Sequence, residues 1–204
     1  MPRFAVIGRW LFAVVAMLAW VSAARAQDAA DAMLADRVIG KADAPITIVE
    51  YASFTCPHCA AFHKDTLPKL KAAWIDTGKA KLVFRDFPLD GAALRAAMMA
   101  RCLPAERYFP VVDILFKNQE SWSHARDPVA ALSGIARLSG LSQEAFDACM
   151  KNEALQKGIL ARAFEAQQQQ KIQATPSFVV NGELMRGAAT FEDFDRALKA
   201  VPGS

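Results

Sequence analysis

The chain has 204 residues, of which 53% are hydrophobic and 22% charged, with 24 Lys and Arg against 21 Asp and Glu. This composition is typical of one globular domain, and it excludes a disordered chain, a collagen-like repeat and a multispan membrane protein. Three of the basic residues lie in the first 26 positions, which contain no acid, so the remaining chain balances 21 against 21. That balance gives no support to a nucleic-acid partner or an acidic substrate.

The N-terminus has the three parts of a secretory signal. Two arginines precede an apolar run over 10–21, and a small-x-small cleavage site ends at Ala26. A run of about a dozen apolar residues is too short for a membrane anchor, because crossing a bilayer needs roughly 20. We therefore expect residues 1–26 to be a cleaved signal peptide, with the mature chain beginning at Gln27 in an oxidising compartment.

Two strands and one helix are predicted in the first part of the mature chain. Apolar and β-branched residues over 45–51 predict a buried strand that leads directly into a Cys-Pro-His-Cys motif. Apolar side chains keep helical spacing from Cys59 to Thr77, with a kink expected at Pro68. A second strand is predicted over 81–87, so the local order is strand, helix, strand.

A helical block follows, without any strand signal. Asp127 and Ser142 have the positions of helix N-caps, and each begins a stretch of apolar residues with helical spacing. The last helix of the block is expected to reach about Ile172, with Phe164 on its apolar face. Because unstructured loops of this length are rare, the block is interpreted as an insertion with its own helices.

The C-terminal part returns to strands. Residues 176–180 and 183–186 are predicted to form a hairpin around an Asn-Gly turn. Thr190, with an aspartate three positions later, predicts the cap of a final helix. Without the helical block, the predicted elements form a small α/β domain.

The Cys-Pro-His-Cys motif lies where a strand ends and a helix begins. Unsatisfied backbone N–H groups and the helix dipole at that position stabilise a thiolate, so Cys56 is expected to be reactive. Cys59 is spaced to close a disulfide onto Cys56 and to release it from a mixed disulfide. A ring N–H or a positive charge on His58 beside the Cys56 sulfur would favour the reduced form and make the disulfide a stronger oxidant.

Other interpretations of the motif remain open. A structural disulfide seldom spans two residues at a helix start, and a c-type haem needs a histidine where Ala60 stands. A zinc or copper site needs two further ligands, whereas His63 and His124 are expected at the surface or as caps. We therefore expect no metal and no cofactor, and keep the structural disulfide and the metal site as less favoured alternatives.

Two further positions bear on the chemistry. Glu50 lies near the end of an apolar strand, where a carboxyl is costly unless it has a function, such as exchanging the proton of Cys59. The alternative for Glu50 is an exposed strand end. Thr175-Pro176 begins the late strand, and a cis bond there would bring the Thr175 backbone beside the cysteines. The alternative is an ordinary trans bond at a strand start.

Taken together, these motifs resemble the DsbA-type branch of the thioredoxin superfamily. The segments that carry the resemblance are Ile48-Val49-Glu50-Tyr51, Cys56-Pro57-His58-Cys59, residues 83–89 and Thr175-Pro176-Ser177-Phe178. The resemblance implies an α/β thioredoxin fold over 27–88 and 172–204, with an inserted helical domain over 89–171. It also implies Cys56 as nucleophile, Cys59 as resolving cysteine, Glu50 as buried acid and Pro176 as cis-proline.

The resemblance further implies a function. Similar proteins donate their disulfide to newly exported chains that carry free thiols, and are reoxidised by a quinone-linked membrane oxidase. A periplasmic, monomeric thiol:disulfide oxidoreductase is therefore expected. The Pro-His dipeptide resembles that of oxidases, whereas a threonine before the cis-proline also occurs in isomerases. A disulfide isomerase or reductase is the alternative, although the short leader argues against the dimer or trimer that isomerases usually form.

The remaining cysteines, Cys102 and Cys149, lie on apolar faces of the helical block. Two readings are open, namely two buried free thiols or a second disulfide. An oxidising compartment favours the disulfide, and sequences of the resembled family carry such a pair in the helical domain. Closing a loop of about 47 residues would stabilise the fold by roughly 4 kcal/mol in the loop-entropy model, so a structural role is expected.

Overall fold

A five-stranded mixed sheet organises the computed structural model, which describes residues 31–201. The expected signal peptide over 1–26 lies outside the described residues. The strands are β1 (Arg37–Ile39), β2 (Ile46–Ala52), β3 (Ala80–Asp86), β4 (Ser177–Val180) and β5 (Glu183–Arg186). Their order is β1-β3-β2-β4-β5, with β2 and β3 parallel and every other neighbouring pair antiparallel. The central position of β2 places its C-terminal end between β3 and β4.

One helical rod follows β2 and covers one face of the sheet. Its consecutive segments are α2 (Pro57–Ala61), η1 (Phe62–Thr66), α3 (Leu67–Leu70) and η2 (Lys71–Ile75). Pro68 lies in the short α-helical turn between the π-helical segments η1 and η2, where the missing N–H of proline disturbs the regular ladder. The rod ends before Gly78, whose φ of +79° suits glycine.

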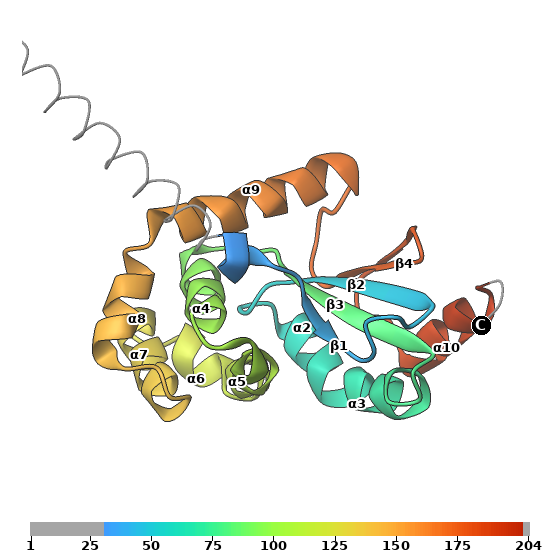
Figure 1. Ribbon diagram of the computed structural model, residues 1–204, viewed down its shortest axis with the longest axis horizontal. Helices are drawn as coiled ribbons and strands as arrows, with labels where there is room; N and C mark the ends of the chain where they lie inside the picture. Colours follow the sequence, from blue (N-terminus) through green and yellow to red (C-terminus); the bar gives the residue numbers. More distant parts are fainter. Residues whose placement is uncertain (1–30, 202–204) are drawn as a thin grey trace, which may run out of the picture.

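The helical block lies between β3 and β4. Its helices are α4 (Gly91–Arg101), α5 (Ala105–Lys117), α6 (Gln119–Ser123), α7 (Pro128–Leu138), α8 (Gln143–Met150) and α9 (Glu153–Gln169). The predicted N-caps are confirmed, because the side chains of Asp127 and Ser142 accept backbone N–H groups at the starts of α7 and α8. In Figure 1, α4 to α8 gather beside the sheet, and α9 runs back from this group toward it.

Helix α9 differs from the prediction in two respects. It ends at Gln169, three residues before Ile172, and Phe164 is 62% exposed although it was expected on the apolar face. The buried face of α9 is instead formed by Leu155, Ile159 and Ala166, which recur at helical spacing. Phe164 is exposed because that buried stripe faces away from it.

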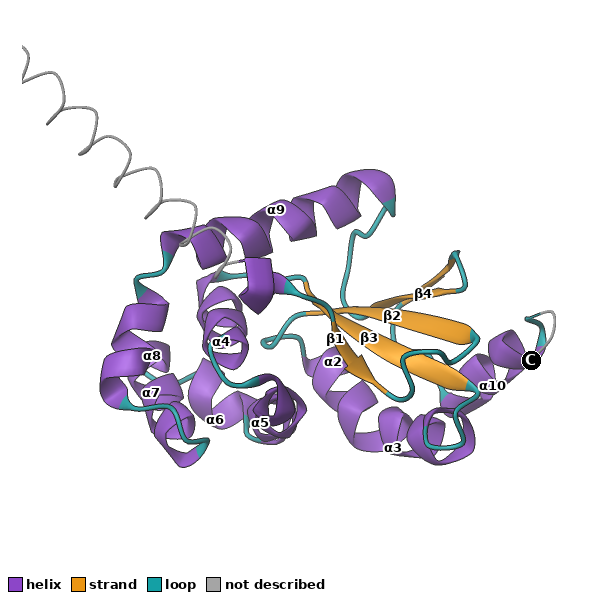
Figure 2. Ribbon diagram, viewed as in Figure 1, coloured by secondary structure: helices purple, strands orange, loops and turns teal. Residues whose placement is uncertain are grey.

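The C-terminal elements complete the α/β part. Hairpin β4–β5 forms around Asn181 and Gly182, both with positive φ, as the Asn-Gly turn predicts. Helix α10 (Phe191–Lys199) begins with a capping box between Thr190 and Asp193. Figure 2 shows α10 on the same side of the sheet as the rod that follows β2. The sheet therefore lies between two helical layers, with the rod and α10 on one face and α9 on the other.

The sheet and the helical block share one hydrophobic core. Phe84 of β3 packs against Tyr108 and Phe116 of α5, and Phe116 also packs against Phe54 in the loop after β2. A buried ion pair crosses the same boundary, from Arg101 of α4 to Asp86 of β3. The loop after β2 is therefore held between the two parts of the fold.

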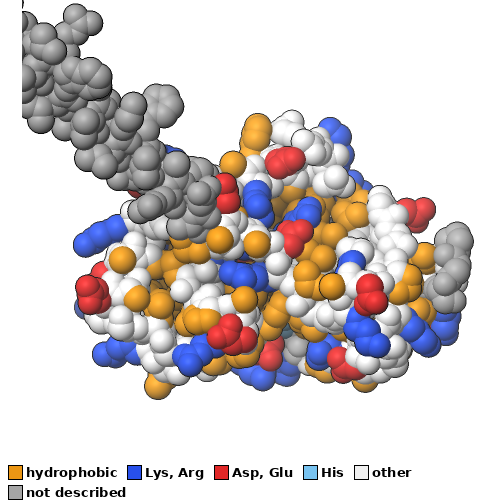
Figure 3. Space-filling view, in the orientation of Figure 1, with side chains coloured by type: hydrophobic (Ala, Val, Ile, Leu, Met, Phe, Trp, Pro, Cys, Tyr) orange, Lys and Arg blue, Asp and Glu red, His pale blue; other side chains and the backbone are white. Residues whose placement is uncertain are grey.

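The surface shows no large field of one charge on the visible face, where basic and acidic side chains are interspersed (Figure 3). This agrees with the balanced charge of the chain beyond its first 26 residues. Within residues 31–201, no helix is both long and apolar enough to cross a membrane.

Candidate active site

The cysteine motif occupies the turn from β2 into α2, as predicted. Cys56 is the N-cap of α2, with extended backbone angles, and Pro57 takes the first helical turn, where a missing N–H costs nothing. The Cys56 carbonyl accepts the N–H groups of Cys59 and Ala60 at 3.1 and 3.2 Å. The N–H groups that remain unpaired at this end of the helix are available to the Cys56 sulfur.

The two thiols are reduced, and their protonation differs sharply. Cys56 is 5% exposed, and its pKa is lowered from 9.0 to about 5. The largest cause is a hydrogen bond from the Cys59 thiol; burial opposes the shift, and interactions with Thr175 and with the backbone N–H groups of Cys59 and His58 add to it. Cys56 is therefore a thiolate at neutral pH.

Cys59 has the opposite character. It is fully buried, and desolvation raises the pKa of its thiol far above the ordinary value. The hydrogen bond with Cys56 and the negative charges of Glu50 and Cys56 raise this pKa further. Cys59 consequently keeps its proton at neutral pH and requires a base before it can act as a nucleophile.

His58 contributes through its backbone. Its side chain is exposed, and among the described residues no hydrogen bond joins its ring to the Cys56 sulfur. The backbone N–H of His58 is one of the groups that lower the Cys56 pKa. The position of His58 at the helix start thus supports the thiolate, whereas the effect expected of its ring remains a prediction.

Glu50 is a buried carboxyl, and the exposed alternative is wrong. Its side chain is 0% exposed in the central strand β2, opposite Phe84 of β3 and Phe178 of β4. Both of its oxygens lie close to Nε2 of His63, at 3.0 and 3.1 Å. His63 therefore does not lie at the surface, as expected from the sequence, but forms a buried pair with Glu50.

The segment that leads into β4, from the C-terminal part of the chain, lies next to the cysteine motif. The Thr175–Pro176 bond is cis, as one of the two readings of this dipeptide predicted. Cys56 Sγ lies 3.2 Å from the carbonyl oxygen of Thr175, to which it donates a hydrogen bond while it is protonated. The fold thereby brings Cys56, Cys59, Glu50 and Thr175 together, from segments that are more than 100 residues apart.

Gln119 is a residue of the site that sequence reasoning missed. It is buried at the start of α6, and its side-chain amide donates to the carbonyls of Phe54 and Cys56 at 2.8 and 2.9 Å. The helical block thus holds the active-site loop directly. No motif marks this glutamine in the sequence, because its role depends on how α6 docks against the loop.

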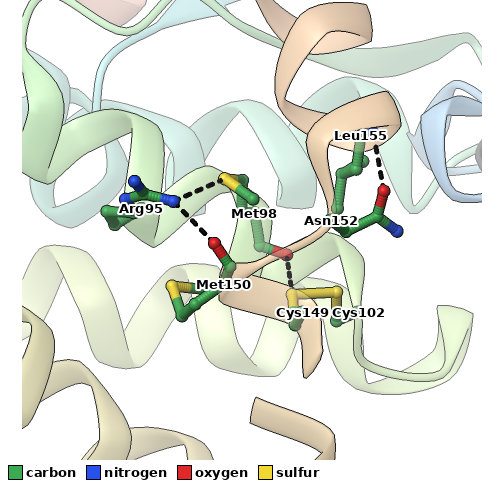
Figure 4. Close-up of a disulfide and its surroundings, with 7 residues drawn as sticks. All are labelled: Arg95, Met98, Cys102, Cys149, Met150, Asn152 and Leu155. Atoms are coloured by element: carbon green, nitrogen blue, oxygen red, sulfur yellow. Dashed lines mark hydrogen bonds between the residues drawn. A yellow bond between two sulfur atoms is a disulfide. The ribbon is translucent and has the colours of Figure 1, made fainter. Parts of the chain in front are cut away.

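Cys102 and Cys149 are joined in a disulfide between the end of α4 and helix α8 (Figure 4). The bond closes a loop with a sequence separation of 47 residues. Arg95 of α4 adds a second link beside it by donating to the carbonyl of Met150 at 2.8 Å. The disulfide therefore fastens two helices of the block, and its structural role remains a prediction.

Comparison with known proteins places this site in a family. The family model described as Thioredoxin matches residues 33–200. A protein-disulfide oxidoreductase, so named, of Rickettsia bellii (strain RML369-C) is 36% identical over 148 residues, which make up 72% of this chain and 57% of that protein. Disulfide bond formation protein D of Bacillus subtilis (strain 168) is 25% identical over 174 residues, covering 79% of this chain and 75% of that protein.

Solved structures show the same fold. The crystal structure of alpha-DsbA1 from Wolbachia pipientis matches with a TM-score of 0.75 and 34% identity, covering 80% of this chain and 89% of that chain. The chain spans little more than half the length of the Rickettsia relative. Because the family model covers most of the sequence and the matched structure is a DsbA protein, this chain belongs to the thioredoxin family and, within it, to the DsbA type.

Proposed function

We propose that this protein is a periplasmic thiol:disulfide oxidoreductase that introduces disulfides into exported proteins. The observation that carries the proposal is the opposite protonation of the two neighbouring thiols. Cys56 has a pKa of about 5, whereas Cys59 is buried and its pKa is raised. A stabilised Cys56 thiolate is a good leaving group, so a disulfide between Cys56 and Cys59 is readily given away.

In the proposed reaction, a substrate thiolate attacks the Cys56 sulfur of the Cys56–Cys59 disulfide. A substrate–Cys56 disulfide forms, and the electron pair of the broken bond goes to Cys59, which takes up a proton. A second substrate thiolate then attacks the substrate sulfur, and Cys56 leaves as a thiolate. The substrate has lost two electrons and gained a disulfide, while the protein has become a dithiol.

The Thr175 backbone supports the contact with substrate. It lies beside Cys56, and an extended peptide that pairs with backbone groups is accepted with little regard to its side chains. Unfolded, newly exported chains with free thiols are therefore the proposed substrates. The two electrons would leave through a disulfide of a quinone-linked membrane oxidase, and the protein would act as a monomer.

The test is oxidation of a reduced, unfolded peptide with two cysteines by the oxidised protein. We expect one peptide disulfide for each protein disulfide consumed, and no peptide oxidation by Cys56→Ala or Cys59→Ala, because neither variant can form the Cys56–Cys59 disulfide. A reduction potential near −120 mV is expected for an oxidant, while about −270 mV would identify a reductant. A potential near the lower value, or failure of the wild-type protein to oxidise the peptide, would contradict the proposal.

Location needs its own measurement. The proposed periplasmic function requires export and removal of residues 1–26. Cell fractionation followed by mass measurement of the mature chain would locate the protein and its first residue. Recovery of the uncleaved chain in the cytoplasm would contradict the periplasmic assignment.

A further inference from the structure

We propose that His63 is a positioning residue for proton transfer at Cys59, and that it acts by holding the Glu50 carboxylate through its Nε2–H. This inference rests on the thiol–disulfide exchange proposed above. It adds to that exchange a residue that none of the predicted motifs contains. His63 lies four positions after Cys59, so the two side chains share one face of the helical rod that follows β2.

His63 is the hydrogen-bond partner that the structure gives to the buried Glu50 carboxyl. His63 Nε2 lies 3.0 and 3.1 Å from the two oxygens of Glu50, and the side chains are 3% and 0% exposed. Among the described residues, no other hydrogen bond to the Glu50 carboxyl is found. A buried carboxylate without a partner is very costly, so His63 supplies the hydrogen bond on which the charged form depends.

The surroundings of His63 define its tautomer. A carboxylate only accepts hydrogen bonds, so Nε2 carries the hydrogen. The other ring nitrogen, Nδ1, is buried and has no hydrogen-bond partner within the described part of the chain. The ring packs against Phe116, with centroids 4.3 Å apart, and against Phe62 and Phe84. These aromatic contacts fix the orientation of the ring that presents Nε2 to Glu50.

Few other charges face this pair. The charge of Glu50 acts on the Cys59 thiol of α2 and on the Tyr108 hydroxyl of α5, and burial raises the pKa of Tyr108 so that it remains neutral. The strands beside Glu50 contribute Phe84 and Phe178, which do not titrate. On β3, Asp86 is engaged with Arg101 of α4. Cys59 is therefore the neighbour of Glu50 that takes part in thiol–disulfide exchange.

The chemistry follows from the Cys59 proton. When reduced protein resolves a mixed disulfide at Cys56, Cys59 gives its proton to the Glu50 carboxylate, directly or through one water. The Cys59 sulfur then forms a bond to the Cys56 sulfur, and the bound thiol leaves with the electron pair of the broken bond. In the opposite direction, protonated Glu50 returns the proton to the Cys59 thiolate. The single Nε2–H of His63 is shared between the two carboxylate oxygens, so each oxygen keeps a lone pair that can accept the proton.

The test measures the release step alone. Reduced protein is mixed with excess glutathione disulfide, quenched with acid at successive times and weighed by mass spectrometry. The mass separates formation of the glutathione–Cys56 disulfide from its resolution by Cys59. We expect His63→Leu to slow resolution at pH 7 by about ten- to a hundredfold, without slowing formation. The midpoint of its pH profile should also move, and His63→Gln, which keeps an N–H donor, should recover most of the rate.

Two variants provide controls. His124→Leu removes an exposed histidine of the same protein and should leave both steps unchanged. Glu50→Gln should slow resolution in the same way, and His63→Leu should add nothing further in the Glu50→Gln background. A His63→Leu protein that follows the wild-type pH profile, or that loses both steps equally, would overturn the proposal.

A measurement on the unaltered protein covers the case in which His63→Leu does not fold. The ¹⁵N chemical shifts of the His63 ring should show hydrogen on Nε2, and a bare Nε2 with hydrogen on Nδ1 would overturn the proposal. The release assay uses reduced protein and glutathione disulfide, so it reports on His63 even if the protein fails to oxidise unfolded chains. Failure of the proposed function and failure of this inference are therefore distinguishable.

Discussion

The pH dependence of the reduction potential gives a sharp test of the cysteine pair. Below about pH 5 both thiols of the reduced form are protonated, so two electrons are taken up with two protons. Above that pH, Cys56 is a thiolate and Cys59 a thiol, so only one proton is taken up. We expect the potential to fall by about 59 mV per pH unit in the first range and by about 30 mV in the second.

The structure also gives the size of the effect at pH 7. The Cys56 pKa lies two units below that pH, and each tenfold change in the equilibrium is worth about 30 mV for two electrons, so the thiolate makes the disulfide about 60 mV more oxidising. The lowering of the Cys56 pKa from 9.0 to about 5 also stabilises the folded, reduced protein, by about 3 kcal/mol at pH 7. Because the folded pKa is the lower one, this stabilisation grows from pH 5 to pH 9 and is lost as the pH falls through 5.

The assay is equilibration with glutathione redox buffers at successive pH values, with the free thiols counted after alkylation. A slope near 59 mV per unit up to pH 8 would refute the reasoning, because Cys56 would then titrate at its ordinary value. Titration of thiolate absorbance in Cys59→Ala tests the cause. Since the Cys59 hydrogen bond is the largest contribution, the Cys56 midpoint should rise in this variant.

Three further predictions concern stability, each measured by urea unfolding. Gln119→Leu leaves a buried carbonyl of the active-site loop without its donor and should cost about 1–3 kcal/mol, whereas an unchanged midpoint would show that the loop is held by other contacts. Cys102→Ala combined with Cys149→Ala should lower stability by about 4 kcal/mol while peptide oxidation continues; lost oxidation without lost stability would place this pair in the mechanism. Arg101→Met leaves Asp86 buried and unpaired and should cost about 3–5 kcal/mol, and replacing Asp86 with Leu as well should restore much of it.

The elements predicted well are those whose signals are local. The strands expected over 45–51 and 81–87 match β2 and β3 to within one residue at each end, because each segment is rich in apolar residues and lies next to a proline. The hairpin and the cap at Thr190 follow from an Asn-Gly turn and from two side chains three residues apart. In each case the residues that determine the structure are neighbours in the sequence.

The features that were missed depend on contacts between distant segments. β1 has only three residues and pairs at the edge of the sheet with β3, so it carries no periodic signal. His63 reads as a surface residue until α5 places Phe116 over its ring. Gln119 contacts the carbonyl of Cys56 across 63 positions of sequence. Only the tertiary arrangement shows that these polar side chains are buried.

Strand β4 follows the helical block in the sequence, and the chain is synthesised from its N-terminus, so β4 is among the last elements to become available for folding. The contact between Cys56 and Thr175 joins residues 119 positions apart, and β4 pairs with β2 only after the whole helical block has emerged. Such long-range pairing forms late in folding. An unfinished chain therefore carries Cys56 without its contact to Thr175, which is one of the interactions that lower the Cys56 pKa. The full lowering of the Cys56 pKa is therefore reached only after β4 has joined the sheet, so the thiol acquires its complete reactivity at the end of folding.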